Sequence, residues 1–205
     1  FWNAPNQDTQ HAYHACLTAK IMMQRLDLLN EQNREQHIPE FHIRIGIHTG
    51  NAVVGNVGSE DRLSFTALGD SVNLASRLEA INKNYYTNII ISQATYSEVS
   101  DAFPFRLLDK VAVRGKEECT AIYELITAKD ISQLDLHKQQ FKKAFTLYQQ
   151  GLWEESIKAF DNLTPAYPGD KLAFLYRERC RKLAASPPPD WDGVWREANK
   201  PTQSL

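Results

Sequence analysis

Two stretches decide the fold of this chain: RIGIHTG at residues 44–50 and FTALGDSVNLASRLE at residues 65–79. In the first stretch, isoleucines alternate with small or polar residues, as they do in a strand with one buried face. The pattern predicts a strand over residues 42–48. The turn residues that follow this strand lead into residues 52–57, which we expect to return beside it as the second arm of a hairpin.

The second stretch changes period along its length. A short extended piece, residues 63–68, is followed by apolar residues three and four apart, which is the spacing of an amphipathic helix. Asp70 and Ser71 precede this helical pattern, and either side chain could accept hydrogen bonds from free amides as the N-cap.

The rest of the chain divides into a mixed part and a helical part. Apolar periodicity predicts a long amphipathic helix at 9–35, a strand at 88–92, a helix at 93–99 and strands at 105–113 and 121–126. Helices packed on a mainly antiparallel sheet define the α+β class. No strand pattern follows residue 131, where three apolar stripes (141–148, 157–160 and 172–176) predict helices, and residues 190–195 could form a short capped helix. We expect one domain at 1–128 and a helical one at 129–205.

Composition excludes several classes of protein. The chain has 205 residues, with 23 Lys and Arg against 25 Asp and Glu, so it lacks the basic footprint of a nucleic-acid-binding protein. Its three cysteines are widely spaced, which predicts reduced thiols in a cytoplasmic setting. No apolar run approaches the roughly 20 residues that span a bilayer. The bulky start at Phe1 and Trp2 suggests that chain precedes it, and we expect these two residues to continue a strand.

Asn73 and Arg77 carry the most informative chemistry. They lie four residues apart, so both project from one face of the first two helical turns. A helix N-terminus has partial positive charge and free amides, and arginine adds a fixed cation, so the pair suits a phosphate-bearing ligand. Alternatively, Asn73 caps the helix locally and Arg77 pairs with a surface carboxylate.

Three strings in order resemble the class III nucleotidyl cyclase catalytic domain: RIGIHTGNAVVGNVG at 44–58, FTALGDSVNLASRLE at 65–79 and VAVRGKEECTAIYEL at 111–125. The resemblance covers residues 1 to about 127. It implies a ferredoxin-like βαββαβ core whose N-terminal part is missing here, working as a head-to-tail homodimer with active sites at the interface. The implied activity is that of an adenylate cyclase, which converts ATP to 3′,5′-cyclic AMP and pyrophosphate.

The resemblance also implies roles for six residues. Asn73 would position the ribose, and Arg77 would stabilise the α-phosphate in the transition state. The substrate contacts would be Thr66 reading the purine edge, where threonine favours ATP over GTP, Ala67 and Val72 lining the adenine pocket, and Arg114 contacting the β- and γ-phosphates.

The implied metal ligands are not in this chain. Cyclase chemistry requires Mg²⁺ or Mn²⁺ held by two carboxylates, and the resemblance places both of them upstream of Phe1. A different interpretation therefore stays open: a catalytically silent homologue that binds nucleotide or acts in dimerisation and docking.

The helical part resembles one tetratricopeptide-type hairpin, through Ala144, Tyr148, Gly151, Trp153 and Phe160. A single repeat cannot bury its own apolar face. It is therefore either a docking module or a cap on the preceding domain. The end of the chain is similar to those of multidomain bacterial cyclases, which implies a cytoplasmic domain of a membrane-anchored sensor protein.

Overall fold

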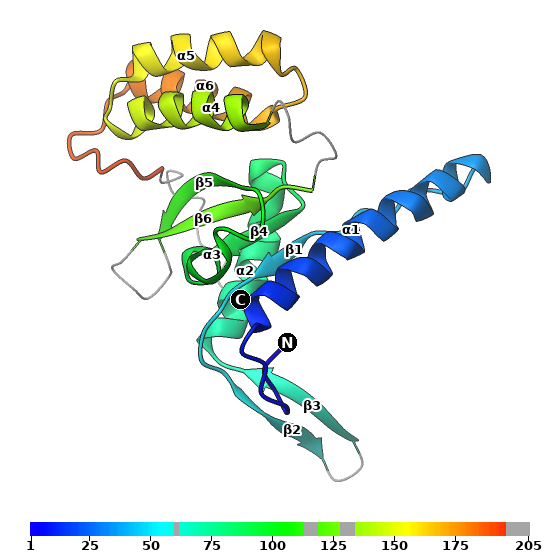
Figure 1. Ribbon diagram of the computed structural model, residues 1–205. Coiled ribbons are helices and arrows are strands. Elements are labelled where there is room, and N and C mark those ends of the chain that lie inside the picture. The colour runs from blue at the N-terminus through cyan, green and yellow to red at the C-terminus, as the bar shows by residue number, and fades with distance from the viewer. Residues whose placement is uncertain (60–61, 113–118, 128–133, 196–205) are drawn as a thin grey trace. The chain divides into compact units, whose positions relative to one another are not determined.

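The computed structural model describes residues 1–59, 62–112, 119–127 and 134–195. Its chain forms two compact units (Figure 1). The first comprises Phe1–Leu108 and Ala121–Lys129, and the second comprises Asp109–Thr120 and Asp130–Leu205. Strand β5 (Phe105–Ala112) thus begins in one unit and ends in the other. The division into domains at residues 128 and 129 stays a prediction.

A four-stranded sheet organises the mixed part of the chain. Its strand order is β1 (Ile45–Ile47), β4 (Ile89–Ser92), β6 (Cys119–Leu125) and β5. Strand β1 runs parallel to β4, whereas β4 and β6 are antiparallel. The α+β class predicted from the sequence is confirmed.

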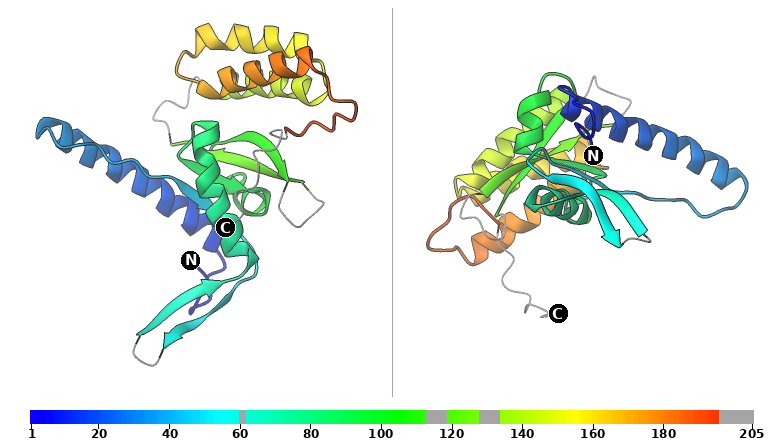
Figure 2. Two further views of the ribbon diagram at one scale, coloured as in Figure 1. Left: turned by 180° about the vertical axis from the view of Figure 1, so that it is seen from behind. Right: turned by 90° about the horizontal axis from the view of Figure 1, so that it is seen from below.

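Helices cover both faces of this sheet (Figures 1 and 2). Helices α1 (His11–Glu35) and α3 (Gln93–Val99) pack on one face, and α2 (Asp70–Tyr85) packs on β1 and β4. All four residues of β4 are buried, which explains why it has three consecutive isoleucines rather than an alternating pattern. The core cluster between α1, α3 and the sheet consists of Ala12, Cys16, Ala19, Met23, Ile89, Ile91, Val99, Phe105 and Leu125.

The predicted hairpin of residues 42–48 and 52–57 is wrong. Strand β2 (Val53–Ser59) pairs instead with β3 (Arg62–Leu68) in a separate antiparallel ribbon, with Val53 opposite Leu68. Local turn residues suggested the hairpin, but β1 takes the fully buried β4 as its partner, a long-range pairing that the sequence pattern does not show.

The start of α2 also differs from the prediction, because Gly69 is the N-cap rather than Asp70 or Ser71. Gly69 has a φ angle of +138°, a backbone conformation that would be strained in a residue with a side chain. The hydroxyl of Ser71 instead donates to the carbonyl oxygen of Asn51 at 2.7 Å, which ties the start of α2 to the loop after β1.

The second unit contains the three predicted helices, α4 (Leu134–Gln149), α5 (Trp153–Ala166) and α6 (Lys171–Ala185). Their buried aromatic core consists of Phe141, Phe145, Tyr148, Phe160 and Tyr176. The short helix predicted at 190–195 is wrong, since this segment is not helical. Its Trp191 indole instead donates to the carbonyl oxygens of Tyr148 and Gln149, where α4 ends. No helix within the described ranges is both long and apolar enough to cross a membrane.

Candidate functional site

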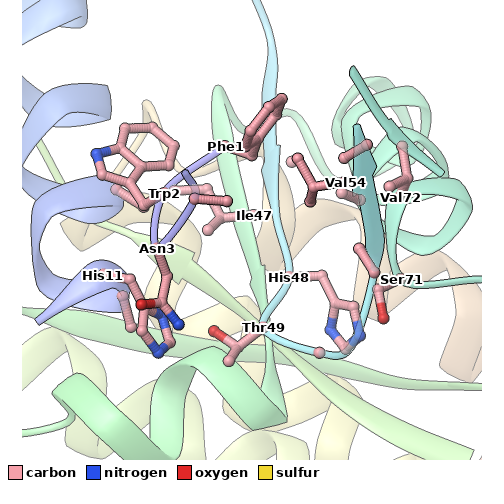
Figure 3. Close-up of a pocket in the computed structure, with 18 of the residues that line it drawn as sticks. Phe1, Trp2, Asn3, His11, Ile47, His48, Thr49, Val54, Ser71 and Val72 are labelled. Atoms are coloured by element: carbon pink, nitrogen blue, oxygen red, sulfur yellow. The ribbon is translucent and has the colours of Figure 1, made fainter. Parts of the chain in front are cut away.

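A pocket of about 650 Å³ lies in the first unit, between the N-terminal residues, the end of β1, the base of the β2–β3 ribbon and the start of α2 (Figure 3). Three of the predicted substrate-binding residues, Thr66, Ala67 and Val72, line it. Thr66 and Ala67 are half-buried at the end of β3, and Val72 is in the first turn of α2. The tertiary structure therefore brings these three residues to one concave surface.

The two walls of the pocket come from different elements. Figure 3 shows Trp2 and His11 on one side and Val54 and Val72 on the other, with Ile47 of β1 between them. The strand expected at the start of the chain is wrong, because Phe1 and Trp2 lie in no strand. The Phe1 ring packs instead near that of Phe65 on β3, with 5.8 Å between ring centroids. The sequence motifs gave no sign that these residues line a pocket, because the juxtaposition is tertiary.

His48, which lines the pocket beyond β1, forms a hydrogen bond that links two elements. Its Nδ1 lies 2.8 Å from the Ser92 hydroxyl, and the Thr95 backbone amide donates to that same hydroxyl at 3.3 Å. Ser92 is the N-cap of α3, so the histidine ties the end of β1 to the start of that helix.

Asn73 and Arg77 lie on the first two turns of α2, where both are exposed, and neither lines the pocket. The local alternative for this pair finds no support in the structure. Gly69 takes the N-cap position, with no side-chain cap bond. No carboxylate of the described residues forms an ion pair with Arg77. Arg77 is therefore an exposed cation that is available to a ligand.

Two further expectations concern the contact to the β- and γ-phosphates and the metal ligands. Arg114 lies outside the described residues. Within the part of the chain that the structure describes, no three His, Cys, Asp or Glu side chains gather as a metal site would require. These residues do not fit a site for Mg²⁺ or Mn²⁺.

The chain matches the adenylate and guanylate cyclase catalytic domain family over residues 3–126. It belongs to this family. The match covers most of the first compact unit and contains the lining of the pocket except Phe1 and Trp2, as well as Asn73 and Arg77.

Curated relatives extend the comparison. Adenylate cyclase 1 of Rhizobium meliloti is 46% identical over 125 residues, which are 61% of this chain and 19% of that protein. The terminal-differentiation-specific adenylate cyclase of Dictyostelium discoideum is 35% identical over 183 residues, which are 86% of this chain and 8% of that protein. The chain thus spans about a fifth or less of the length of these two relatives. The second similarity covers more of the chain than residues 3–126 account for, so it continues into the helices.

Solved structures show the same fold. The adenylyl cyclase CyaB from P. aeruginosa is 30% identical, with a TM-score of 0.51 over 61% of this chain and 65% of that chain. The guanylyl cyclase Cya2 is 28% identical, with a TM-score of 0.51 over 63% of this chain and 64% of that chain. The ferredoxin-like cyclase core implied by the sequence resemblance is confirmed by these neighbours.

Proposed function

We propose that this chain is the catalytic part of an adenylate cyclase. In the reaction, the ribose 3′-oxygen of ATP attacks the α-phosphorus and loses its proton. The bond from the α-phosphorus to the oxygen bridging to the β-phosphate breaks, and pyrophosphate leaves. One observation gives the proposal its main support. Arg77, in the family motif on α2, is exposed, and no carboxylate of the described residues forms an ion pair with it.

Arg77 would stabilise charge that develops on the α-phosphate. Arginine stays protonated at physiological pH, and a positive charge placed where negative charge develops is the basis of electrostatic catalysis. Asn73, one turn earlier, would hold the ribose so that its 3′-oxygen lies in line with the phosphorus. The exposure of both side chains on one helix supports a site that a second surface completes.

The pocket residues Thr66, Ala67 and Val72 would receive the purine. Apolar side chains with a single hydroxyl suit the flat face and polar edge of an adenine ring. The relatives from Rhizobium and Dictyostelium are both named adenylate cyclases, which favours ATP, whereas Cya2 is a guanylyl cyclase of the same fold. Arg114 would meet the β- and γ-phosphates.

Mg²⁺ or Mn²⁺ would neutralise the triphosphate and lower the pKa of the 3′-hydroxyl. Its two carboxylate ligands would be those that the family resemblance implies.

We infer that the active form is a homodimer. The β2–β3 ribbon exposes several large apolar side chains, with Val53 75%, Leu63 62% and Leu68 51% exposed. Apolar side chains gathered on a two-stranded ribbon are typical of a surface that a partner covers.

In the full-length protein, we further propose that a membrane-anchored sensor domain controls this cytoplasmic part. We also propose a role for the helical extension, which comprises α4, α5 and α6 and contains the tetratricopeptide-like hairpin. It either docks a partner or caps the cyclase domain.

The test is a direct assay of the full-length protein with ATP and with GTP, in Mg²⁺ and in Mn²⁺, with the products separated by chromatography. We expect cyclic AMP and pyrophosphate in equal amounts. Cyclic GMP as the main product would refute the purine assignment. Nucleotide binding without any cyclic product would identify the protein as a silent homologue.

A further inference from the structure

The loop after β1, residues 48–51, forms part of the pocket wall, and buried groups anchor its start. The His48 Nδ1 lies 2.8 Å from the Ser92 hydroxyl, and the Thr49 hydroxyl lies 3.1 Å from that of Thr95. Ser92 is 1% exposed and Thr95 is 0% exposed, so neither can exchange its partner for bulk water. Because a buried polar group that loses its partner is costly, these two contacts hold the loop on the start of α3.

The other end of this loop holds the start of α2. The Ser71 hydroxyl donates to the carbonyl oxygen of Asn51 at 2.7 Å. Gly69, the N-cap of α2, has no side chain, so the first turn lacks the hydrogen bond that often stabilises a helix start. The bond from Ser71 to the loop therefore takes the place of a cap in fixing where this turn lies.

Gly50 is the point at which the two anchored ends of the loop meet. A Cβ atom at Gly50 would lie 2.4 Å from the Ser71 Oγ and 2.9 Å from the His48 Nε2. Both side chains thus pack against the same backbone position, and Figure 3 shows the His48 ring beside the Ser71 side chain. The position of the imidazole therefore sets how closely the start of α2 can approach the loop.

The first turn of α2 carries a side chain of the proposed purine pocket. Val72, the residue after Ser71, lines the pocket, and its backbone amide donates to the Gly69 carbonyl oxygen at 3.1 Å. A shift of this turn therefore moves the Val72 wall of the pocket. Leu78, further along the helix, is 1% exposed, so the part of α2 that carries Arg77 stays packed when the first turn shifts.

We propose that His48 is a positioning residue for purine binding: by holding the loop between α3 and α2, it fixes the first turn of α2 and with it the Val72 wall of the pocket. In this role the imidazole touches none of the reacting atoms and transfers no proton. This inference rests on the proposed function, because that function assigns the pocket to the purine.

The test compares His48→Ala with wild type in the full-length protein. We expect His48→Ala to raise the KM for ATP about fivefold, with kcat changed by less than about threefold, because a contact made in the ground state weakens. The inhibition constant of pyrophosphate, which has no purine, should stay near wild type. An enzyme that is merely less stable would instead lose kcat through its smaller folded fraction and keep its KM for ATP.

Two further variants serve as controls. His48→Asn is the conservative change, since its amide lies as many bonds from the backbone as the imidazole Nδ1 and can keep the hydrogen bond to Ser92. It should restore the KM for ATP to within about twofold of wild type. His42→Ala removes an exposed histidine just before β1 and should change neither constant.

Hydrogen exchange tests the same link without turnover. The amides of Val72 and Asn73, which both donate to the Gly69 carbonyl oxygen, should exchange faster in His48→Ala than in His42→Ala, while α1 stays protected in both. If His48→Ala does not fold, Ser71→Ala decides in its place with the same expected rise in KM. It removes only the hydroxyl at the other end of the loop and keeps a good helix former.

Three results would overturn the role of His48: a wild-type KM with unchanged exchange in the folded variant, an equal rise in KM for His48→Asn, or a parallel rise in the inhibition constant of pyrophosphate. A wild-type protein that forms no cyclic nucleotide would overturn the proposed function instead. Hydrogen exchange would then still decide whether His48 fixes the first turn of α2.

Discussion

The side-chain amide of Asn82, fully buried on α2, donates a hydrogen bond to the backbone carbonyl of Ile45 on β1 at 3.0 Å. The same amide nitrogen lies within hydrogen-bonding distance of the Leu78 and Glu79 carbonyl oxygens, and its Oδ1 accepts from the Thr87 hydroxyl at 2.9 Å. One polar side chain thus joins the helix that carries Asn73 and Arg77 to the strand at the floor of the pocket.

Replacing this asparagine should therefore cost more stability than its size suggests. Asn82→Leu leaves the Thr87 hydroxyl and the Ile45 carbonyl without their partner in a buried setting, a loss of about 1–3 kcal/mol in the free energy of unfolding. Asn84→Leu, at an exposed position of the same helix, should change it by less than about 0.5 kcal/mol. Urea denaturation of both variants measures the difference, and equal midpoints would contradict the structural role of Asn82.

Gly46 of β1 lies directly under α2. A Cβ atom added there would overlap the backbone of Ala75 and Glu79, which cannot move without shifting the helix. Gly46→Ala should destabilise the protein by about 2 kcal/mol or more, as expected for overpacking against backbone. Gly55 is the matched control, since a Cβ atom there meets nothing within 4 Å. A thermal melt of Gly46→Ala that coincides with that of Gly55→Ala would show that α2 does not approach β1 so closely.

Arg77 should act on the rate more than on substrate binding. Loss of a charge that stabilises the transition state typically lowers kcat by about 10²–10³-fold, so we expect this for Arg77→Ala with a much smaller change in the KM for ATP. Lys83→Ala removes an exposed cation from the last turn of the same helix and should leave kcat within about twofold of wild type. Steady-state kinetics on the full-length protein measure kcat and the KM for ATP of both variants. A kcat for Arg77→Ala equal to that of wild type would remove this residue from the mechanism.

The three cysteines should differ sharply in reactivity. Burial raises the pKa of the Cys16 thiol to about 12 and that of Cys180 to about 11, whereas Cys119 is exposed. Because the thiolate is the reactive form, a disulfide reagent at pH 8 should modify one thiol per native chain and three per denatured chain. Cys119→Ser should leave the native chain unreactive, and fast modification of two native thiols would contradict this.

The same raised pKa values predict a loss of stability at high pH. The unfolded thiols ionise near pH 9, and the folded ones resist ionisation until pH 11 to 12. Their contribution is therefore fully present below pH 9 and is lost as the pH rises from there through the folded values. Denaturation midpoints measured at pH 8 and pH 10 should fall less for a Cys16→Ala variant than for wild type.

Sequence reasoning succeeded where structure is local. The period of apolar residues located α1, α2 and the three helices of the extension, and the motifs around Asn73 and Arg77 identified the family. It failed where a strand pairs with another strand that is distant in the sequence. The turn residues after β1 suggested a hairpin, but β1 pairs in parallel with β4, and β2 pairs with β3.

By itself, the sequence determined the class of fold, the helices and the family, because these follow from short-range periodicity and from ordered motifs. Only the tertiary structure decided that Thr66, Ala67 and Val72 share one pocket with Trp2, and that Asp109 meets Arg179. These are contacts between segments far apart along the chain, and they depend on burial and packing geometry that no local pattern records.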